Sequence, residues 1–196
     1  MGYKIAITGG IGSGKSTVCD ILKEHGYEVF SCDEIYKNLL CDALYVEKVK
    51  AAFPNAVECG RVNLNKLSSI VFNNETDLKK LNDIAHPAIM QKLLNEMNTA
   101  AGKLVFAEVP LLFEGEYEHL FDKIFVVTRN RDERIASVMK RSNLTREEVL
   151  SRMQMQFPYD TQTAKTHFKK VNAFIIQNVG DFNQLKDNIL ATLADL

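Results

Sequence analysis

The sequence lacks the patterns that would indicate a membrane, secreted or nucleic-acid-binding protein. No apolar run approaches the roughly 20 residues that a membrane-spanning helix needs, and the N-terminus shows no basic start followed by a long apolar stretch. With 24 Lys and Arg against 25 Asp and Glu, the chain has no basic excess for binding nucleic acid. We therefore expect a cytoplasmic protein whose partners are small molecules, with no nucleic acid, membrane or obligate protein partner.

The cysteines also lack the spacing of the common zinc and redox motifs. Cys19, Cys32, Cys41 and Cys59 form no C-x-x-C pair, and no neighbouring histidine completes a zinc-binding pattern. Free cysteine behaves as a small apolar residue. We therefore expect reduced thiols, as in a cytosolic protein.

The order of strand-like and helical segments predicts one α/β domain over residues 1–196. Strands are predicted at residues 3–8, 27–32, 104–109, 123–128 and 173–177. Helices are predicted at residues 16–25, 33–40, 44–53, 64–72, 77–98, 131–141, 146–156 and 182–196, with a loop at 55–63 and a break near His86-Pro87. Strands separated by helices indicate a parallel five-stranded sheet with helices on both faces, which binds ligands at the carboxyl ends of its strands.

A glycine-rich segment after the first predicted strand matches the phosphate-binding pattern G-x-x-x-x-G-K-S/T from Gly9 to Ser16. Its glycines let backbone N–H groups approach phosphate oxygens, and the following helix presents its positive end. Lys15 adds a full charge for the β- and γ-phosphates, and Ser16 offers a hydroxyl to magnesium. The alternative is a chance glycine-rich turn, but the position between strand and helix is the context that the motif needs. The predicted nucleotide-binding residues are Gly10, Ile11, Gly12, Ser13, Gly14, Lys15, Ser16 and Thr17.

Three acidic residues lie at or after the ends of predicted strands. Asp33 is placed to take a proton from an attacking hydroxyl, or alternatively to cap a helix. Glu108 interrupts a buried strand, where a charge is costly unless it is paired or near a metal. It is a candidate to orient magnesium, the alternative being a carboxylate at an exposed strand end or one bonded to backbone N–H groups. Glu114 is a candidate substrate contact or the start of the next helix.

Arginines are concentrated between Arg129 and Arg152. Arginines that close over a phosphoryl group in transfer lower the barrier electrostatically, and a lid also excludes water. The alternative is a solvated helical face with pairs such as Glu148 and Arg152. Arg141, at the end of a predicted helix, is the first candidate for a lid arginine, and Arg134 lies nearly two turns earlier on the same face.

Together these motifs closely resemble the dephospho-CoA kinase family, in order and over nearly the whole chain. The resemblance rests on Ile7–Thr17, Asp33, the His86-Pro87 element in Leu81–Ile89, Glu108–Glu114, and Arg141 followed by Thr145–Val149, Arg152 and Gln156. The glycine-rich loop is shared with many kinases. The elements around His86-Pro87 and Glu108–Glu114 are more specific to this family.

The resemblance implies a kinase that uses ATP and Mg²⁺ to phosphorylate the ribose 3′-hydroxyl of dephospho-CoA, the last step of coenzyme A synthesis. It implies a P-loop core like that of nucleoside monophosphate kinases, a helical CoA-binding region at about 34–100 and a lid at about 134–170. By position, Asp33 would be the catalytic base. Lys15 would be a second catalytic residue, and Arg141 a third, which belongs to the lid. His86, Glu108, Leu111 and Glu114 would contact the acceptor, and Ser16 and Glu108 the metal.

The C-terminal part departs from the family pattern. The family usually has an Ala-Asp pair before a short strand that ends in Asp-Asn-x-Gly, whereas this chain has Ala173 or Phe174, and Gln177, at the acidic positions. Ser137 and Val138 stand where the family pattern has an arginine before Arg141. The segment 157–170 is longer than the family pattern leads us to expect. These changes concern contacts with adenine and in the lid rather than phosphate chemistry.

Two other functions are compatible with the same core. One is a different small P-loop kinase, acting on a nucleoside monophosphate or a small alcohol, which would differ only in its acceptor pocket. The other is a nucleotide-dependent switch, whose GTP-binding form normally carries an Asn-Lys-x-Asp element. The nearest candidate here, Thr128–Asp132, does not match that element.

Overall fold

The computed structural model describes residues 2–72 and 74–196, and the chain divides into two compact units. One, which we call the sheet unit, comprises the residues up to Val29 together with Ala100–Leu196. The other, the helical unit, is Phe30–Thr99. In the part of the chain that the structure describes, no helix combines the length and the apolar character needed to cross a bilayer.

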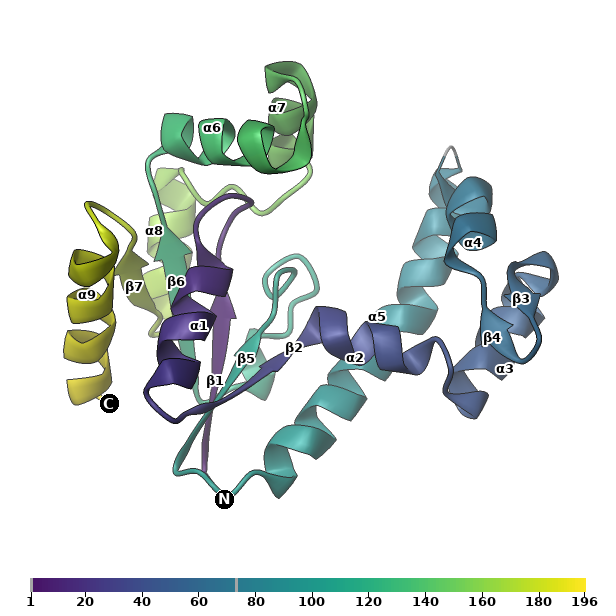
Figure 1. Cartoon of the computed structure of the whole chain (residues 1–196), viewed down its shortest axis with the longest axis horizontal. Helices are drawn as coiled ribbons and strands as arrows, with labels where there is room; N and C mark the ends of the chain where they lie inside the picture. The colour runs from purple at the N-terminus through teal and green to yellow at the C-terminus, as the bar shows by residue number, and fades with distance from the viewer. Residues whose placement is uncertain (1, 73) are drawn as a thin grey trace. The chain divides into compact units, whose positions relative to one another are not determined.

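The sheet unit is built on a five-stranded sheet with the strand order β2-β5-β1-β6-β7 (Figure 1). The strands are β1 (Tyr3–Thr8), β2 (Glu28–Ser31), β5 (Leu104–Glu108), β6 (Lys123–Thr128) and β7 (Phe174–Gln177). The boundary between the units falls within β2, after Val29. The β1 strand pairs in parallel with β5 and with β6, and β6 pairs in parallel with β7. The predicted parallel five-stranded sheet is therefore confirmed. Because the register pairs Ile7 with Glu108 and Thr8 with Val126, the carboxyl ends of three strands lie at one edge.

Helices cover both faces of this sheet, as the sequence predicts. The helices of the unit are α1 (Lys15–Glu24), α6 (Arg131–Ser142), α7 (Arg146–Gln154), α8 (Gln162–Lys170) and α9 (Phe182–Ala194), with a short turn η2 (Glu118–Leu120). The α1 and α9 helices bury Leu22 and Ile189 against Ile7, Phe106 and Phe125 of one face. The α8 helix lies behind the sheet in the view of Figure 1.

The α8 helix is not among the helices that the sequence predicts. Its N-cap is Thr161, whose hydroxyl accepts the N–H of Ala164 at 3.2 Å. An aromatic cluster, in which Phe168 of α8 contacts Phe113, Phe157 and Tyr159, holds the helix in place. The contact with Phe113 joins segments that are far apart in the sequence, so short-range periodicity does not reveal it.

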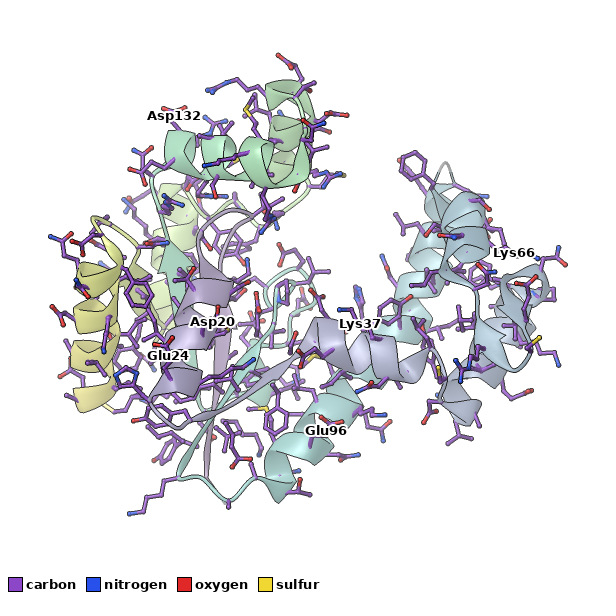
Figure 2. The ribbon with its side chains drawn as sticks, in the orientation of Figure 1. Asp20, Glu24, Lys37, Lys66, Glu96 and Asp132 are labelled. Carbon is purple, nitrogen blue, oxygen red and sulfur yellow. The ribbon has the colours of Figure 1, made fainter. Side chains whose placement is uncertain are left out.

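The helical unit contains four α-helices and a small hairpin within its described residues. They are α2 (Cys32–Leu39), α3 (Ala43–Ala52), α4 (Leu64–Val71) and α5 (Glu75–Thr99), with η1 (Pro54–Ala56) and the strands β3 (Val57–Glu58) and β4 (Arg61–Val62). The predicted loop at 55–63 is thus wrong in part, because β3 and β4 pair there antiparallel. Figure 2 labels Lys37 on α2, Lys66 on α4 and Glu96 on α5.

The predicted break near His86-Pro87 is also wrong. The α5 helix runs without interruption through Pro87, which lies on the exposed side of the helix. Proline removes one hydrogen bond of the helix, but on this side the unpaired carbonyl can be hydrated. The opposite side buries Leu81, Ala85 and Met90, and this packing favours a continuous helix.

Candidate active site

The glycine-rich loop connects β1 to α1, the strand-to-helix context that the phosphate-binding motif requires. Gly12 and Gly14 have positive φ angles of 78° and 98°, which side chains with a Cβ rarely adopt. A Cβ on Gly12 would also lie 2.7 Å from the backbone oxygen of Arg134. The loop conformation therefore depends on glycine at these two positions.

Free hydrogen-bond donors collect where this loop enters α1. The N-cap, Gly14, provides no side-chain hydrogen bond to the helix, so the first N–H groups of α1 remain available to an anion. The Ser13 hydroxyl is buried, and within the described residues it has no hydrogen-bond partner. Ser16 is exposed and Thr17 half-buried in the first turn. A cradle of donors with an unsatisfied hydroxyl fits the phosphate groups of a nucleotide.

Lys15 bends back over the loop that precedes it. Its ammonium donates to the carbonyl oxygen of Gly9 at 2.7 Å and lies 3.4 Å from that of Gly10. Burial lowers the pKa of this ammonium, and the nearby carboxylate of Glu108 opposes the shift. The carboxylate therefore favours the charged form of Lys15, which phosphate binding requires.

Glu108, the last residue of β5, is half-buried beside Lys15 and the thiol of Cys19. The thiol lies 3.9 Å from Glu108 Oε2 and donates to it. Burial raises the pKa of Cys19 to about 12, and the charge of Glu108 adds to the shift, so the thiol stays protonated. Cys19 is thus an inert packing residue, as expected from the sequence.

Ser16 and Glu108 supply oxygen donors of the kind that Mg²⁺ prefers. Among residues 2–72 and 74–196 there is no cluster of three or more His, Cys, Asp or Glu side chains that could hold a metal ion. A kinase usually binds Mg²⁺ through one or two protein groups together with phosphate oxygens and water. The residues present therefore fit a magnesium ion that arrives with a nucleotide, rather than a closed metal site.

Both backbone groups of Ile11 are held by side chains from distant segments. Arg134, which is 4% exposed, donates from Nε to the Ile11 carbonyl at 3.0 Å. Gln156 Oε1 accepts the Ile11 N–H at 2.8 Å. The Ile11 side chain packs against the small core of α6 and α7 around Val138 and Val149. Arg134, which the sequence offers as a lid candidate, thus also supports the loop, a contact that its sequence position does not reveal.

Two further residues anchor the loop from the C-terminal part of the sheet unit. Asn178 donates from Nδ2 to the carbonyl of Ser13 at 2.8 Å. The Tyr159 hydroxyl lies 3.0 Å from the hydroxyl of Thr8, where β1 ends, and the two share a hydrogen bond. Burial raises the pKa of Tyr159, so its phenol stays protonated. Asn178 falls where the family pattern has Asp-Asn-x-Gly, a signal that could have pointed to this role.

The segment after β5 carries Leu111 and Glu114, which were predicted to contact the acceptor. It forms turns rather than a helix, so the alternative of Glu114 as the start of a helix is wrong. Glu114 accepts the backbone N–H of Phe157 at 2.8 Å, and Leu111 is 41% exposed. Arg141 is exposed in the last turn of α6. The acceptor and lid roles of these residues stay predictions.

Asp33 and His86 belong to the helical unit. Asp33 is exposed in the first turn of α2, and Ser31 occupies the N-cap position, so the alternative of Asp33 as an N-cap is wrong. Its carboxylate remains available for another role. His86 is half-buried on α5, where burial lowers its pKa and the charge of Asp83 opposes the shift.

Comparisons with known protein sequences agree on one family. A family model described as dephospho-CoA kinase matches residues 3–183. A dephospho-CoA kinase of Thermus thermophilus is 36% identical over 192 residues, which cover 98% of this chain and 91% of that protein. The dephospho-CoA kinase of Geobacillus kaustophilus is 35% identical over 199 residues, with 98% and 96% coverage.

Solved structures give the same result. A Thermus thermophilus protein, TT1252, superposes with a TM-score of 0.80 at 35% identity and covers 100% of this chain and 98% of that one. A dephospho-CoA kinase from Campylobacter jejuni superposes with a TM-score of 0.65 at 25% identity, with 98% and 96% coverage.

Proposed function

This chain belongs to the dephospho-CoA kinase family, and from that premise we propose which of its residues transfer the γ-phosphoryl group of ATP to dephospho-CoA. The reaction forms a bond between the ribose 3′-oxygen and the γ-phosphorus and breaks the bond to the β-phosphate oxygen. Its products are coenzyme A and ADP. The observation that carries the assignment of roles is the loop between β1 and α1, where free N–H donors, a buried unsatisfied hydroxyl and the Lys15 ammonium converge.

Residues Gly10–Thr17 bind the phosphates of ATP. Backbone N–H groups and the start of α1 hold the β- and γ-phosphates, and Lys15 exchanges its carbonyl partners for phosphate oxygens. Negative charge spreads over the γ-phosphoryl oxygens during transfer, and a fixed ammonium stabilises that charge without reorganising. The support from Arg134, Gln156 and Asn178 keeps the loop in place before ATP arrives.

Ser16 and Glu108 would hold the magnesium ion that accompanies ATP. When bound, the ion would neutralise negative charge on the phosphates. Ser16 would offer its exposed hydroxyl from the first turn of α1, and Glu108 would offer its carboxylate from the end of β5. Glu108 lies beside Lys15, which supports this assignment.

Asp33 takes the proton of the attacking 3′-hydroxyl. Its carboxylate is exposed and does not cap α2, which leaves it available for a base role. Its position also matches the family's catalytic base. His86, Leu111 and Glu114 contact the acceptor, and Arg141 belongs to a lid of about 134–170 that closes over the phosphates in the cytoplasmic enzyme.

An acceptor panel tests this function. The protein, ATP and Mg²⁺ are incubated separately with dephospho-CoA, with AMP and with small alcohols, and ADP release and product mass are recorded. Dephospho-CoA should give a product heavier by one phosphoryl group. Turnover of AMP without turnover of dephospho-CoA would assign the chain to a different kinase activity. Slow ADP release with no phosphorylated acceptor would indicate a nucleotide switch.

A further inference from the structure

One cavity of the sheet unit involves none of the predicted nucleotide-binding residues. Its volume is about 590 Å³, and its lining residues all lie between Thr128 and Gln177. This volume is in the range of small-molecule sites, which is about 300–1,000 Å³. We call it the basic cavity, and define it by Arg131, Lys165, Lys169, Tyr159, Phe168 and Ile175 of its lining.

The charge of the basic cavity is strongly positive. Four cationic side chains line it, namely Arg129, Arg131, Lys165 and Lys169, against the single acid Asp160. Arg129 pairs with Glu133, and Asp160 is already engaged by Arg134. In residues 2–72 and 74–196, no hydrogen bond or ion pair engages the side chains of Arg131, Lys165 and Lys169. Three cations without an acidic partner favour an anionic ligand.

The floor of the basic cavity is apolar and partly aromatic. Tyr159 and Phe168 are buried beneath it, and Ile175 of β7 is 41% exposed. Successive residues of a strand point to opposite faces, so Ile175 lies on the face opposite to Ile176, which packs with α1 and α9. The cavity is therefore on the α8 side of the sheet. Its combination of cations and rings suits a ligand that is itself both charged and apolar.

Two lining residues also support the phosphate-binding loop. The Tyr159 hydroxyl bonds with Thr8 at the end of β1. Asp160 accepts from Arg134 at 2.9 and 3.1 Å, and Arg134 in turn holds the carbonyl of Ile11. A molecule in the basic cavity would thus touch residues on which the loop conformation depends.

We propose that the basic cavity is a second ligand site, which binds a phosphorylated small molecule with an aromatic or apolar group and is coupled to the nucleotide site through Tyr159 and Asp160. The phosphate pairs with Lys165, Lys169 and Arg131, and the apolar group covers Phe168 and Ile175. Coupling between two sites is reciprocal. A ligand in the basic cavity therefore changes the affinity for nucleotide by the same factor by which bound nucleotide changes the affinity for that ligand. This site is independent of which acceptor the enzyme phosphorylates.

Binding of 1-naphthyl phosphate to the full chain tests the site. The protein is first saturated with ADP and Mg²⁺, which fills the nucleotide site, and the probe is titrated by calorimetry. The double variant Lys165→Gln/Lys169→Gln should bind the probe about tenfold more weakly or worse, as expected for the loss of charge-assisted hydrogen bonds. The matched control is Lys23→Gln/Lys103→Gln, which removes two exposed lysines elsewhere on the unit and should bind like wild type. Equal affinity in wild type and Lys165→Gln/Lys169→Gln, or no binding to wild type, would overturn the proposal.

Two further measurements separate the parts of the proposal. Ile175→Ser should weaken 1-naphthyl phosphate severalfold and leave inorganic phosphate unchanged, because only the apolar group contacts this residue. Equal effects on both probes would overturn the apolar component. The affinity for ADP should change when 1-naphthyl phosphate is present with wild type but not with Lys165→Gln/Lys169→Gln. An ADP affinity that responds identically in the two proteins would refute the coupling.

Discussion

The guanidinium of Arg134 is bonded through Nε to the backbone oxygen of Ile11, at a distance of 3.0 Å. This bond joins the first turn of α6 to the glycine-rich loop. The same guanidinium pairs through Nη1 with Asp160. A buried charge is stable only when it is paired and hydrogen-bonded, and both conditions are met here. The loop conformation is therefore set by α6 as well as by its own glycines.

Replacing Arg134 should weaken nucleotide binding and the fold together. Arg134→Met leaves the Ile11 carbonyl without its donor, and an unmade bond of this kind costs about 1–3 kcal/mol. We expect a loss of that size in the free energy of unfolding by urea, and roughly tenfold weaker ADP binding by calorimetry. Arg146→Met is the matched control. Arg146 pairs with Asp132 of α6, which Figure 2 labels, and this exposed ion pair adds little to the free energy of unfolding. Wild-type ADP affinity in Arg134→Met would contradict the positioning role.

Removing the Lys15 ammonium should abolish turnover. Lys15→Ala removes the one full positive charge within the loop, and we expect kcat/KM for ATP to fall by about 10³-fold or more, since electrostatic stabilisation is usually the largest catalytic contribution. Lys23→Ala, which removes an exposed lysine from the other end of α1, should retain activity. Coupled measurement of ADP release compares the two. A Lys15→Ala enzyme within tenfold of wild type would show that the loop binds phosphate without this charge.

Changing Asp33 should affect catalysis rather than ATP binding. If Asp33 takes the proton from the 3′-hydroxyl, Asp33→Asn should lower kcat by about 10²-fold or more and leave the Kd of ATP nearly unchanged. Glu34→Gln removes another exposed carboxylate from the same turn of α2 and serves as the control. Steady-state kinetics and a nucleotide titration separate the two effects. Normal turnover by Asp33→Asn would assign the base role elsewhere.

Much of the fold follows from local sequence. The apolar strands at residues 3–8 and 123–128, and the glycine-rich loop between the first strand and its helix, are each encoded within a few neighbouring positions. The helix at 77–98 was predicted with a break, so its continuity through Pro87 was missed, and the α8 helix was not predicted. In both, packing against distant residues outweighs a local signal, because burial of Leu81 and Met90 in one case and of Phe168 in the other stabilises the helix.

The candidate site divides in the same way. The loop residues could be predicted because their motif is one short continuous stretch of sequence. Glu108 could be predicted because it lies within an apolar strand pattern, which is also local. The residues that hold the loop could not, because Arg134 and Gln156 reach Ile11 from 123 and 145 positions away. No periodicity or spacing connects such residues, and only the tertiary fold brings them together.

Glu108 should control the magnesium requirement and the alkaline limit of activity. If Glu108 helps to hold the ion, Glu108→Gln should raise the Mg²⁺ concentration that gives half-maximal rate, because a neutral amide is a weaker partner for the ion than a carboxylate. The carboxylate also favours the protonated form of Lys15, so its loss should lower the pKa of that ammonium further. The alkaline decline of kcat/KM should then begin at a lower pH than in wild type. Glu116→Gln, an exposed residue of the following turn, is the control. Unchanged Mg²⁺ and pH dependence in Glu108→Gln would exclude both roles.

His86 should make the stability of the protein fall on the acid side. Burial lowers the pKa of His86 from its ordinary value of 6.5, so between that value and the folded pKa the unfolded chain binds more protons than the folded one. The contribution of His86 is thus fully present above pH 6.5 and is lost as the pH falls through the folded pKa. We expect the free energy of unfolding of wild type, followed by urea titration from pH 8 to pH 5, to decrease more than that of His86→Gln. His119→Gln removes an exposed histidine of the other unit and should follow wild type. Parallel curves for wild type and His86→Gln would mean that the imidazole titrates equally in both states.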